Sequence, residues 1–238
     1  MPGHRPESPL RVVPPGPRCQ PVGMPTASRP DRPGAREWVP PDGDVEALRA
    51  AGPACRGCEL WEPATQVVVS SGDASARVVL VGEQPGDVED REGVPFVGPA
   101  GRLLVKAVDE AGIPREVIYR TNAVKHFRFT QAGPGKRRIH QTPELRHITA
   151  CRPWLVEELR VVDPEVVVCL GATAVRALLG PSVRVMRDRG ELLTRETSLG
   201  AKTFLVTVHP SAVLRADDQD AAYAGLVADL RVAAAALG

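Results

Sequence analysis

The sequence predicts a three-layer α/β/α sandwich around a central, mainly parallel sheet of four strands. Short runs of β-branched and other apolar residues recur along the chain, and segments with helical periodicity separate them. Strands that alternate with helices form parallel sheets through right-handed crossovers, which place helices on both faces. We therefore expect one α/β domain whose ligand cleft lies beyond the carboxyl ends of the strands.

Four runs are expected to be the strands of this sheet. Nearly every position in them is apolar, which is typical of strands that are covered on both faces. In chain order they are RVVLV (77–81), VIYR (117–120), EVVVCL (165–170) and FLVTV (204–208).

The intervening segments have the periodicity of helices. We expect helices over residues 100–111, 143–161, 172–179 and 221–236. For the second of these, Thr142 and Pro143 supply a capping residue and a proline at the first helical position.

The first part of the chain differs in composition from the rest. Half of the 24 prolines fall within residues 1–41, interleaved with Arg, Gly and Ser. Such a segment buries too little apolar surface to offset its ordering entropy. Residues 1–43 are therefore expected to be a disordered Pro/Arg-rich tail, and residues 44–238 the folded domain.

Overall composition narrows the class of protein. The formal net charge of +1 over 238 residues excludes a uniformly basic nucleic-acid coat, so any attraction for phosphate must come from local patches. No apolar run reaches the roughly 18 residues of a membrane-spanning helix, and the N-terminus does not resemble a secretory signal. Five cysteines, an odd number, fit a reducing compartment and metal ligation better than a disulfide framework. We expect a cytoplasmic monomer.

Three cysteines and one histidine are candidate metal ligands. Cys55 and Cys58 form a C-x-x-C pair on a glycine-containing turn, Cys151 is a third thiol, and His126 is the plausible fourth ligand. A Cys₃His set is familiar for zinc, whereas iron–sulfur clusters usually have four cysteines and occasionally a histidine. The spacing alone leaves both open. Cys169, in the middle of a strand, is expected to be a small buried apolar residue.

The longest signature follows the first expected strand. It reads GEQPGDVEDREGVPFVGPAGRLL, from Gly82 to Leu104, and combines acids, glycines and Phe96. Asn122 follows the second strand and His209 the fourth, so the three segments should converge on one cleft. They could hold a small polar substrate against Phe96; the plainer alternative is an acidic loop solvated at the sheet edge.

This segment resembles the motif GE-x-PG-x-x-ED-x-x-G-x-PFVG-x-AG-x-LL of family 4 uracil-DNA glycosylases, which carry an iron–sulfur cluster. The resemblance continues through TNAVK (121–125), CRPWL with its following strand and LG-x-x-A (151–174), and HPS (209–211). It covers about residues 44–236 and implies a uracil-DNA glycosylase-like fold.

Two departures point to one branch of that family. His126 stands where family 4 has a cysteine, and a longer segment containing GKRRIH (135–140) precedes Cys151. Together with Gln84, these features resemble UdgX, whose members bind uracil-DNA covalently through the histidine of this loop. The resemblance implies a [4Fe–4S] cluster on Cys55, Cys58, His126 and Cys151.

The resemblance also implies a role for each cleft residue. His209 is expected to stabilise the departing uracil, Glu83 the sugar cation, and His140 is expected to capture that cation in place of water, with Gln84 positioning groups. Phe96 suits stacking on the flipped base, and Asn122 suits its O4 and N3–H edge. Further expected substrate contacts are Gly82, Asp87, Asp90 and Arg215, and expected phosphate contacts are Lys136, Arg137 and Arg138.

The expected partner is uracil-containing DNA, with single strands favoured. Two alternatives stay open. One is a conventional glycosylase with multiple turnovers in which GKRRIH only grips phosphates. The other is a metal-stabilised nucleic-acid-binding module without catalysis, although such a module has no need of Glu83 or His209.

Overall fold

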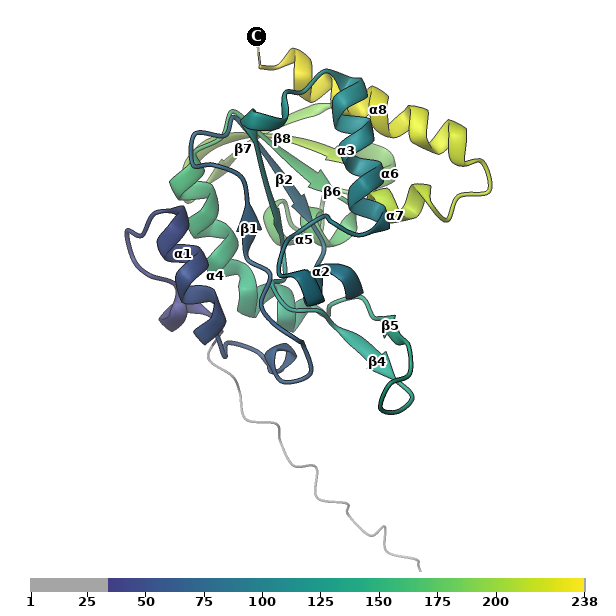
Figure 1. Ribbon diagram of the computed structural model, residues 1–238. Coiled ribbons are helices and arrows are strands. Elements are labelled where there is room, and N and C mark those ends of the chain that lie inside the picture. The colour runs from purple at the N-terminus through teal and green to yellow at the C-terminus, as the bar shows by residue number, and fades with distance from the viewer. Residues whose placement is uncertain (1–33, 238) are drawn as a thin grey trace, which may run out of the picture. The chain divides into compact units, whose positions relative to one another are not determined.

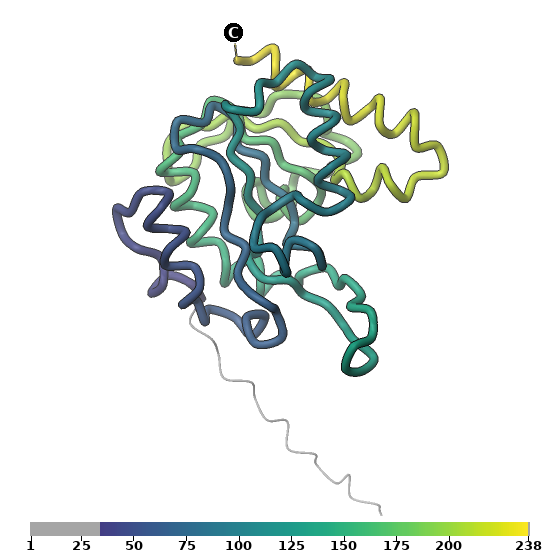
Figure 2. The backbone as a smooth tube through the Cα atoms, in the orientation of Figure 1, coloured from purple at the N-terminus to yellow at the C-terminus, as the bar shows by residue number. Residues whose placement is uncertain are grey.

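The computed structural model describes residues 34–237, and the greater part of the expected N-terminal tail lies outside this range. Ahead of the expected domain start at residue 44, Ala35 is buried and its amide donates to the carbonyl of Ala150. A short 3₁₀ helix, Arg36–Trp38, follows. Figure 2 shows this purple segment beside the green helix that contains Ala150.

The central sheet has six strands in the order β1-β3-β2-β6-β8-β7. In chain order they are β1 (Ser70–Ser71), β2 (Val78–Gly82), β3 (Ile118–Asn122), β6 (Val166–Leu170), β7 (Leu192–Thr197) and β8 (Gly200–Thr207). The four expected strands are the parallel centre, β3-β2-β6-β8. The sheet is wider than the expected four strands because antiparallel β1 and β7 extend its edges.

Helices cover both faces of the sheet, which confirms the α/β/α prediction (Figure 1). They are α1 (Val45–Ala51), α2 (Asp87–Glu92), α3 (Pro99–Ala111), α4 (Leu145–Val162), α5 (Ala172–Leu178), α6 (Val185–Asp188), α7 (Pro210–Val213) and α8 (Gln219–Ala235). One core cluster joins the sheet to α1, α4 and α5, and the other joins it to α3 and α8. Within the described residues, no helix is both long and apolar enough to cross a membrane.

The start of α4 differs from the prediction. Glu144, not Thr142, is the capping residue, and Pro143 lies before it rather than at the first helical position. The amide of Glu144 donates to Nδ1 of His147, whose buried side chain also contacts Glu59 at 3.0 Å. His147 is therefore part of the packing at the start of this helix.

A hairpin outside the sheet carries the GKRRIH segment. Its strands are β4 (Phe129–Gln131) and β5 (Arg138–His140), which pair in antiparallel register so that Phe129 lies opposite His140. In Figure 1 the hairpin extends from the body of the domain beside α2. The chain thus places its basic segment on an arm next to the carboxyl ends of the strands.

A buried ion pair fastens β3 to α4 behind the cleft. Lys125 Nζ lies 2.6 Å from Glu158 Oε2, and the two side chains are 1% and 0% exposed. Lys125 also donates to the carbonyl of Asn122, and Glu158 accepts from Thr121. The pair therefore fixes the backbone at the end of β3.

Removing one member of this pair should be costly, because it leaves an uncompensated charge in the core. Lys125→Met is expected to lower the free energy of unfolding by about 3–5 kcal/mol. Adding Glu158→Leu should restore much of that loss, since both charges are then absent. Chemical denaturation of the single and double variants measures both effects; a double variant that is the sum of two large losses would contradict this account.

Candidate active site

At the carboxyl ends of β2 and β3, the side chains of Asn122 and Phe96 lie against the backbone of Gly82, and we call these three residues the slot. A Cβ atom at this position would lie 2.3 Å from Asn122 Oδ1 and 2.7 Å from Cζ of Phe96. Only glycine therefore lets the amide of Asn122 and the ring of Phe96 come this close to the strand backbone. Both side chains are buried.

Phe96 has a strained backbone. Its φ angle is +60°, in the left-handed region that non-glycine residues seldom occupy. Gly101 makes room for this conformation, because a Cβ there would lie 2.0 Å from the carbonyl oxygen of Phe96. Strain held in this way by surrounding structure is often found at ligand sites, and here it directs the ring toward Gly82.

His209 caps α7 at the carboxyl end of β8. Its Nδ1 accepts from the backbone amide of Ser211 at 3.2 Å and lies 2.8 Å from the Ser211 hydroxyl. Burial, with smaller contributions from His140 and Arg215, lowers the pKa of His209 to about 4. The ring is therefore neutral near pH 7, and because Nδ1 accepts, its proton resides on Nε2 as a hydrogen-bond donor.

Glu83 joins three strand ends. One carboxylate oxygen accepts from the hydroxyl of Thr173, at the start of α5, and the other lies 3.3 Å from Nε2 of His140. The His140 side chain is 48% exposed, so its ring lies at the open side of the cleft. Burial, opposed by Glu83 and assisted by Arg215, lowers the pKa of His140. A carboxylate and a neutral imidazole thus face one another.

Gln84 holds the base of the hairpin. Its side-chain oxygen accepts from the amide of Arg128 at 3.0 Å, and its amide nitrogen donates to the carbonyls of Arg128 and Gln141. Gln84 therefore bridges the residue before β4 and the residue after His140. These contacts are with the backbone at the base of the hairpin, as expected of a residue that positions other groups.

Arg138 fastens the hairpin to α2. Its guanidinium donates to Asp87 and, at 2.6 Å, to Asp90, and it lies over the rings of Phe127 and Phe129. The side chain is 10% exposed. The expected phosphate contact from Arg138 and the expected substrate contact from Asp90 do not fit this pairing, because both side chains are held inside the protein. Asp87 is 38% exposed and pairs with Arg91 as well as with Arg138.

The remaining cations are open to solvent. Lys136 and Arg137 are exposed at the turn of the hairpin, and Arg215 is exposed after α7.

Three of the four candidate metal ligands, Cys55, Cys58 and Cys151, belong to the core cluster beside α4. Cys55, Cys58, Cys151 and His126 are all buried. The indole of Trp154 donates to Cys55 and the amide of Lys125 to Cys151, each at 3.3 Å, and such donors suit thiolate sulfurs. Burial, together with the neighbouring Cys58 and Cys55, raises the pKa of Cys151 to about 12, although Lys125 opposes this.

His126 is chemically suited to complete the set. Burial lowers its pKa to about 4, so the ring is neutral, as a metal-ligating imidazole must be. In the described part of the chain, no three His, Cys, Asp or Glu side chains converge closely enough to hold a single ion. Cys169 is fully buried in β6, as expected of a packing residue.

Two site residues were not anticipated. Thr173 holds Glu83, and Ser211 fixes the tautomer of His209. Both follow the carboxyl ends of parallel strands, so the rule that led to Asn122 and His209 could also have found them.

Comparison with known proteins agrees with this geometry. Residues 69–231 match the Uracil DNA glycosylase superfamily. The chain is 39% identical to a Type-4 uracil-DNA glycosylase of Thermotoga maritima over 162 residues. The aligned residues make up 68% of this chain and 78% of that protein. Type-4 uracil-DNA glycosylases of Archaeoglobus fulgidus (35% identical; 67% and 78% covered) and Sulfurisphaera tokodaii (31%; 71% and 76%) are also similar. The chain belongs to the uracil-DNA glycosylase superfamily.

Proposed function

We propose that this protein is a uracil-DNA glycosylase of the UdgX type, which excises uracil and remains bound through His140 to C1′ of the abasic sugar. The observation that carries the proposal is the 3.3 Å contact between His140 and Glu83, the residue that follows Gly82. A conventional glycosylase needs a water molecule at this point, whereas here an imidazole is held there.

Recognition of uracil rests on the slot around Gly82. Asn122 offers a donor and an acceptor, which match O4 and N3–H of uracil, and Phe96 offers a stacking surface. Cytosine presents the opposite pattern at this edge and leaves buried polar groups unpaired, at about 1–3 kcal/mol for each group. A base within a duplex must first be flipped out, so a single strand is the less costly substrate.

Bond cleavage places negative charge on uracil and positive charge on the sugar. When the C1′–N1 bond breaks, its electron pair leaves with uracil, and the Nε2–H of His209 stabilises the charge that develops on O2. Glu83, oriented by Thr173, stabilises the sugar cation. The unprotonated ring nitrogen of His140 then donates its lone pair to C1′, and the alkylated ring becomes neutral by releasing its remaining N–H proton to Glu83 or to water.

The hairpin gives the imidazole its advantage over water. Gln84 holds the base of the arm and Arg138 its second strand, so His140 is kept close to Glu83 before the substrate binds. Positioning of this kind can be worth several orders of magnitude in effective concentration. Lys136 and Arg137, at the exposed turn, are suited to bind phosphates on either side of the flipped nucleotide.

We also propose that Cys55, Cys58, His126 and Cys151 hold a [4Fe–4S] cluster. Burial, the N–H···S contacts and the neutral imidazole support this assignment, and a cluster bound by one ligand at each iron needs no convergence on a single point. When bound, the cluster would supply a structural link between the N-terminal turn, the end of β3 and α4. It takes no part in the steps above.

Replacing His140 should separate adduct formation from excision. We expect His140→Ala to lose the covalent product while still releasing uracil, because His209, Asn122 and Glu83 are intact. Denaturing electrophoresis detects the adduct, and chromatography detects free uracil. Thr130→Ala, on the opposite strand of the hairpin, is the matched control and should keep the adduct. A His140→Ala adduct of unchanged yield would refute the assignment.

The lowered pKa of His140 predicts a specific pH profile. A lowered pKa preserves the neutral, nucleophilic ring to more acidic pH, so the single-turnover rate of adduct formation should fall at a lower pH than an ordinary histidine would cause. Arg215→Gln removes a nearby positive charge, which raises the pKa of His140 and moves the acidic limb to higher pH. Rates measured at saturating DNA test this; an unmoved limb, or one moved to lower pH, would contradict it.

The cluster assignment predicts the metal content of the protein. Anaerobically purified protein should contain about four iron atoms per chain, and it should be brown because an iron–sulfur cluster absorbs visible light. Cys58→Ser should lose most of the iron, whereas Cys169→Ser, at a buried thiol outside the set, should retain it. Elemental analysis decides the matter, and stoichiometric zinc in the wild type would rule out the cluster.

A further inference from the structure

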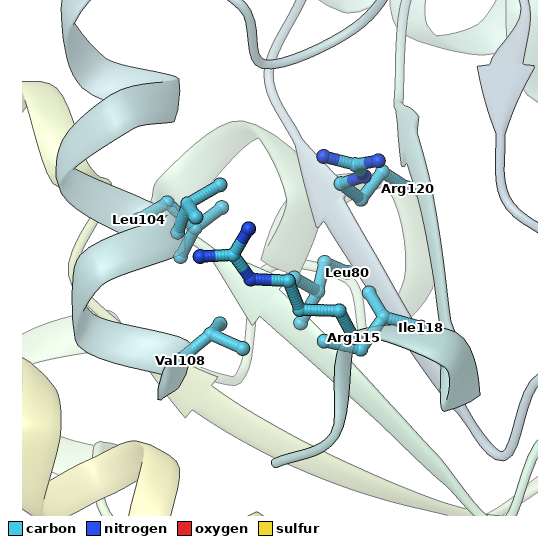
Figure 3. Close-up of a pocket in the computed structure, with 7 residues that line it drawn as sticks. Leu80, Leu104, Val108, Arg115, Ile118 and Arg120 are labelled. Atoms are coloured by element: carbon cyan, nitrogen blue, oxygen red, sulfur yellow. The ribbon is translucent and has the colours of Figure 1, made fainter. Parts of the chain in front are cut away.

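A cavity separate from the uracil slot lies between α3 and the sheet. Its volume is about 120 Å³. The guanidinium groups of Arg115 and Arg120 form part of its lining. The remaining walls are apolar and are formed by Leu80, Leu104, Val105, Val108 and Ile118. In Figure 3 the side chains of Arg115 and Arg120 both extend toward the space beside Leu104. None of these residues belongs to the proposed catalytic site.

Arg120 lies on a face of the sheet that is otherwise apolar. It is paired with Leu80 in the β2–β3 register and follows Ile118 by two residues, so its side chain shares their face under α3. Most residues of this face belong to the core cluster beneath α3 and α8. A cation at such a position loses part of its hydration and normally requires a partner.

No partner is present within residues 34–237. The Arg120 guanidinium makes neither a hydrogen bond nor an ion pair there. Arg115, in contrast, donates to both carboxylate oxygens of Asp109, which satisfies its charge. Burial, and then the proximity of Arg115, lowers the pKa of Arg120. The positive charge at this position is therefore retained at a cost in stability.

A second polar group beside Arg120 also has no partner. Ser71 lies directly opposite Arg120 in the antiparallel β1–β3 pair, so the two side chains project to the same face. The buried hydroxyl of Ser71 makes no hydrogen bond within the described residues. Unsatisfied buried polar atoms are uncommon in folded proteins and call for an explanation.

We propose that this cavity binds a small organic carboxylate with a compact apolar body. Two oxygens of a carboxylate match the fork of the Arg120 guanidinium, the unpaired charged group of the cavity lining, whereas Ser71 does not line the cavity. A cavity of roughly 150 Å³ accepts benzene. The present cavity is smaller, at about 120 Å³, so a single ring is the upper limit for the apolar body. Phosphate or sulfate would leave the five aliphatic side chains against a strongly hydrated ion.

The volume of the cavity also favours a free carboxylic acid over a carboxylate that belongs to a protein partner. An apolar body of benzene size fits within the cavity, whereas a peptide chain does not. The ligand is therefore expected to be a free carboxylic acid, and benzoate is a suitable probe.

Thermal unfolding with three probes tests the proposal. Benzoate at ten times its dissociation constant should raise the Tm by roughly 3–5 °C. Benzamide, which has the same body without the charge, and sulfate, which has charge without the body, should each give a much smaller shift. Equal shifts with benzamide or with sulfate would overturn the proposal, as would no shift with benzoate at any concentration up to tens of millimolar.

Two variants locate the site. Arg120→Gln removes the charge and should weaken benzoate binding about tenfold or more. Val105→Phe fills the cavity from α3 and should abolish binding although Arg120 remains. Arg176→Gln, at an exposed arginine of α5, is the matched control and should bind benzoate as the wild type does. Benzoate binding that survives both cavity variants would place the ligand elsewhere and refute the assignment.

Uracil release provides a check on folding. Arg120→Gln should release uracil at the wild-type rate, because the cavity contributes nothing to the slot around Gly82. In the absence of benzoate it should also have an equal or higher Tm, since an unpaired charge has been removed from a partly buried position. Loss of uracil release would show that Arg120 serves the fold or the active site, which would count against a separate ligand site.

Discussion

The site depends on the ion pairing of Arg138 with Asp87 and Asp90. Asp90 is completely buried and accepts from Arg138 and from the amide of Thr65, so its charge is compensated only while β5 lies against α2. A short two-stranded hairpin has little stability of its own. The buried carboxylate of Asp90 therefore holds the hairpin in one position. Because Arg138 is fixed, the positions of Ile139 and His140, which follow it in β5, are also set.

The sheet supplies the other half of the site. Parallel strands bring the ends of β2, β3, β6 and β8 to one edge, and each end contributes a short polar segment. Gly82 allows Asn122 and Phe96 to approach one another, and Ser211 sets the proton of His209 on Nε2. The proposed uracil recognition thus rests on the strand ends, whereas the proposed capture of the sugar rests on a hairpin attached to them by side chains.

The sequence predicted the parts that depend on local pattern. Continuous apolar runs identified the four central strands, and strand-end motifs identified the slot residues. The edge strands β1 and β7 were missed, because β1 has two residues and β7 is largely exposed and polar. Arg138 was interpreted as a phosphate contact because nothing local reveals a partner that lies 48 residues away in the chain. Arg120 likewise lies in an expected strand, and nothing in that segment predicts that its side chain lines a cavity.

The central claim is that the anchored arm lets an imidazole outcompete water for the sugar cation. The most direct measurement is the ratio of protein-bound to free abasic DNA formed in one turnover by the Arg138→Gln variant. The account predicts at least about a tenfold fall in this ratio, because the arm loses its anchor, with total uracil release maintained by the intact slot. A ratio equal to that of the wild type, at equal uracil release, would contradict the account.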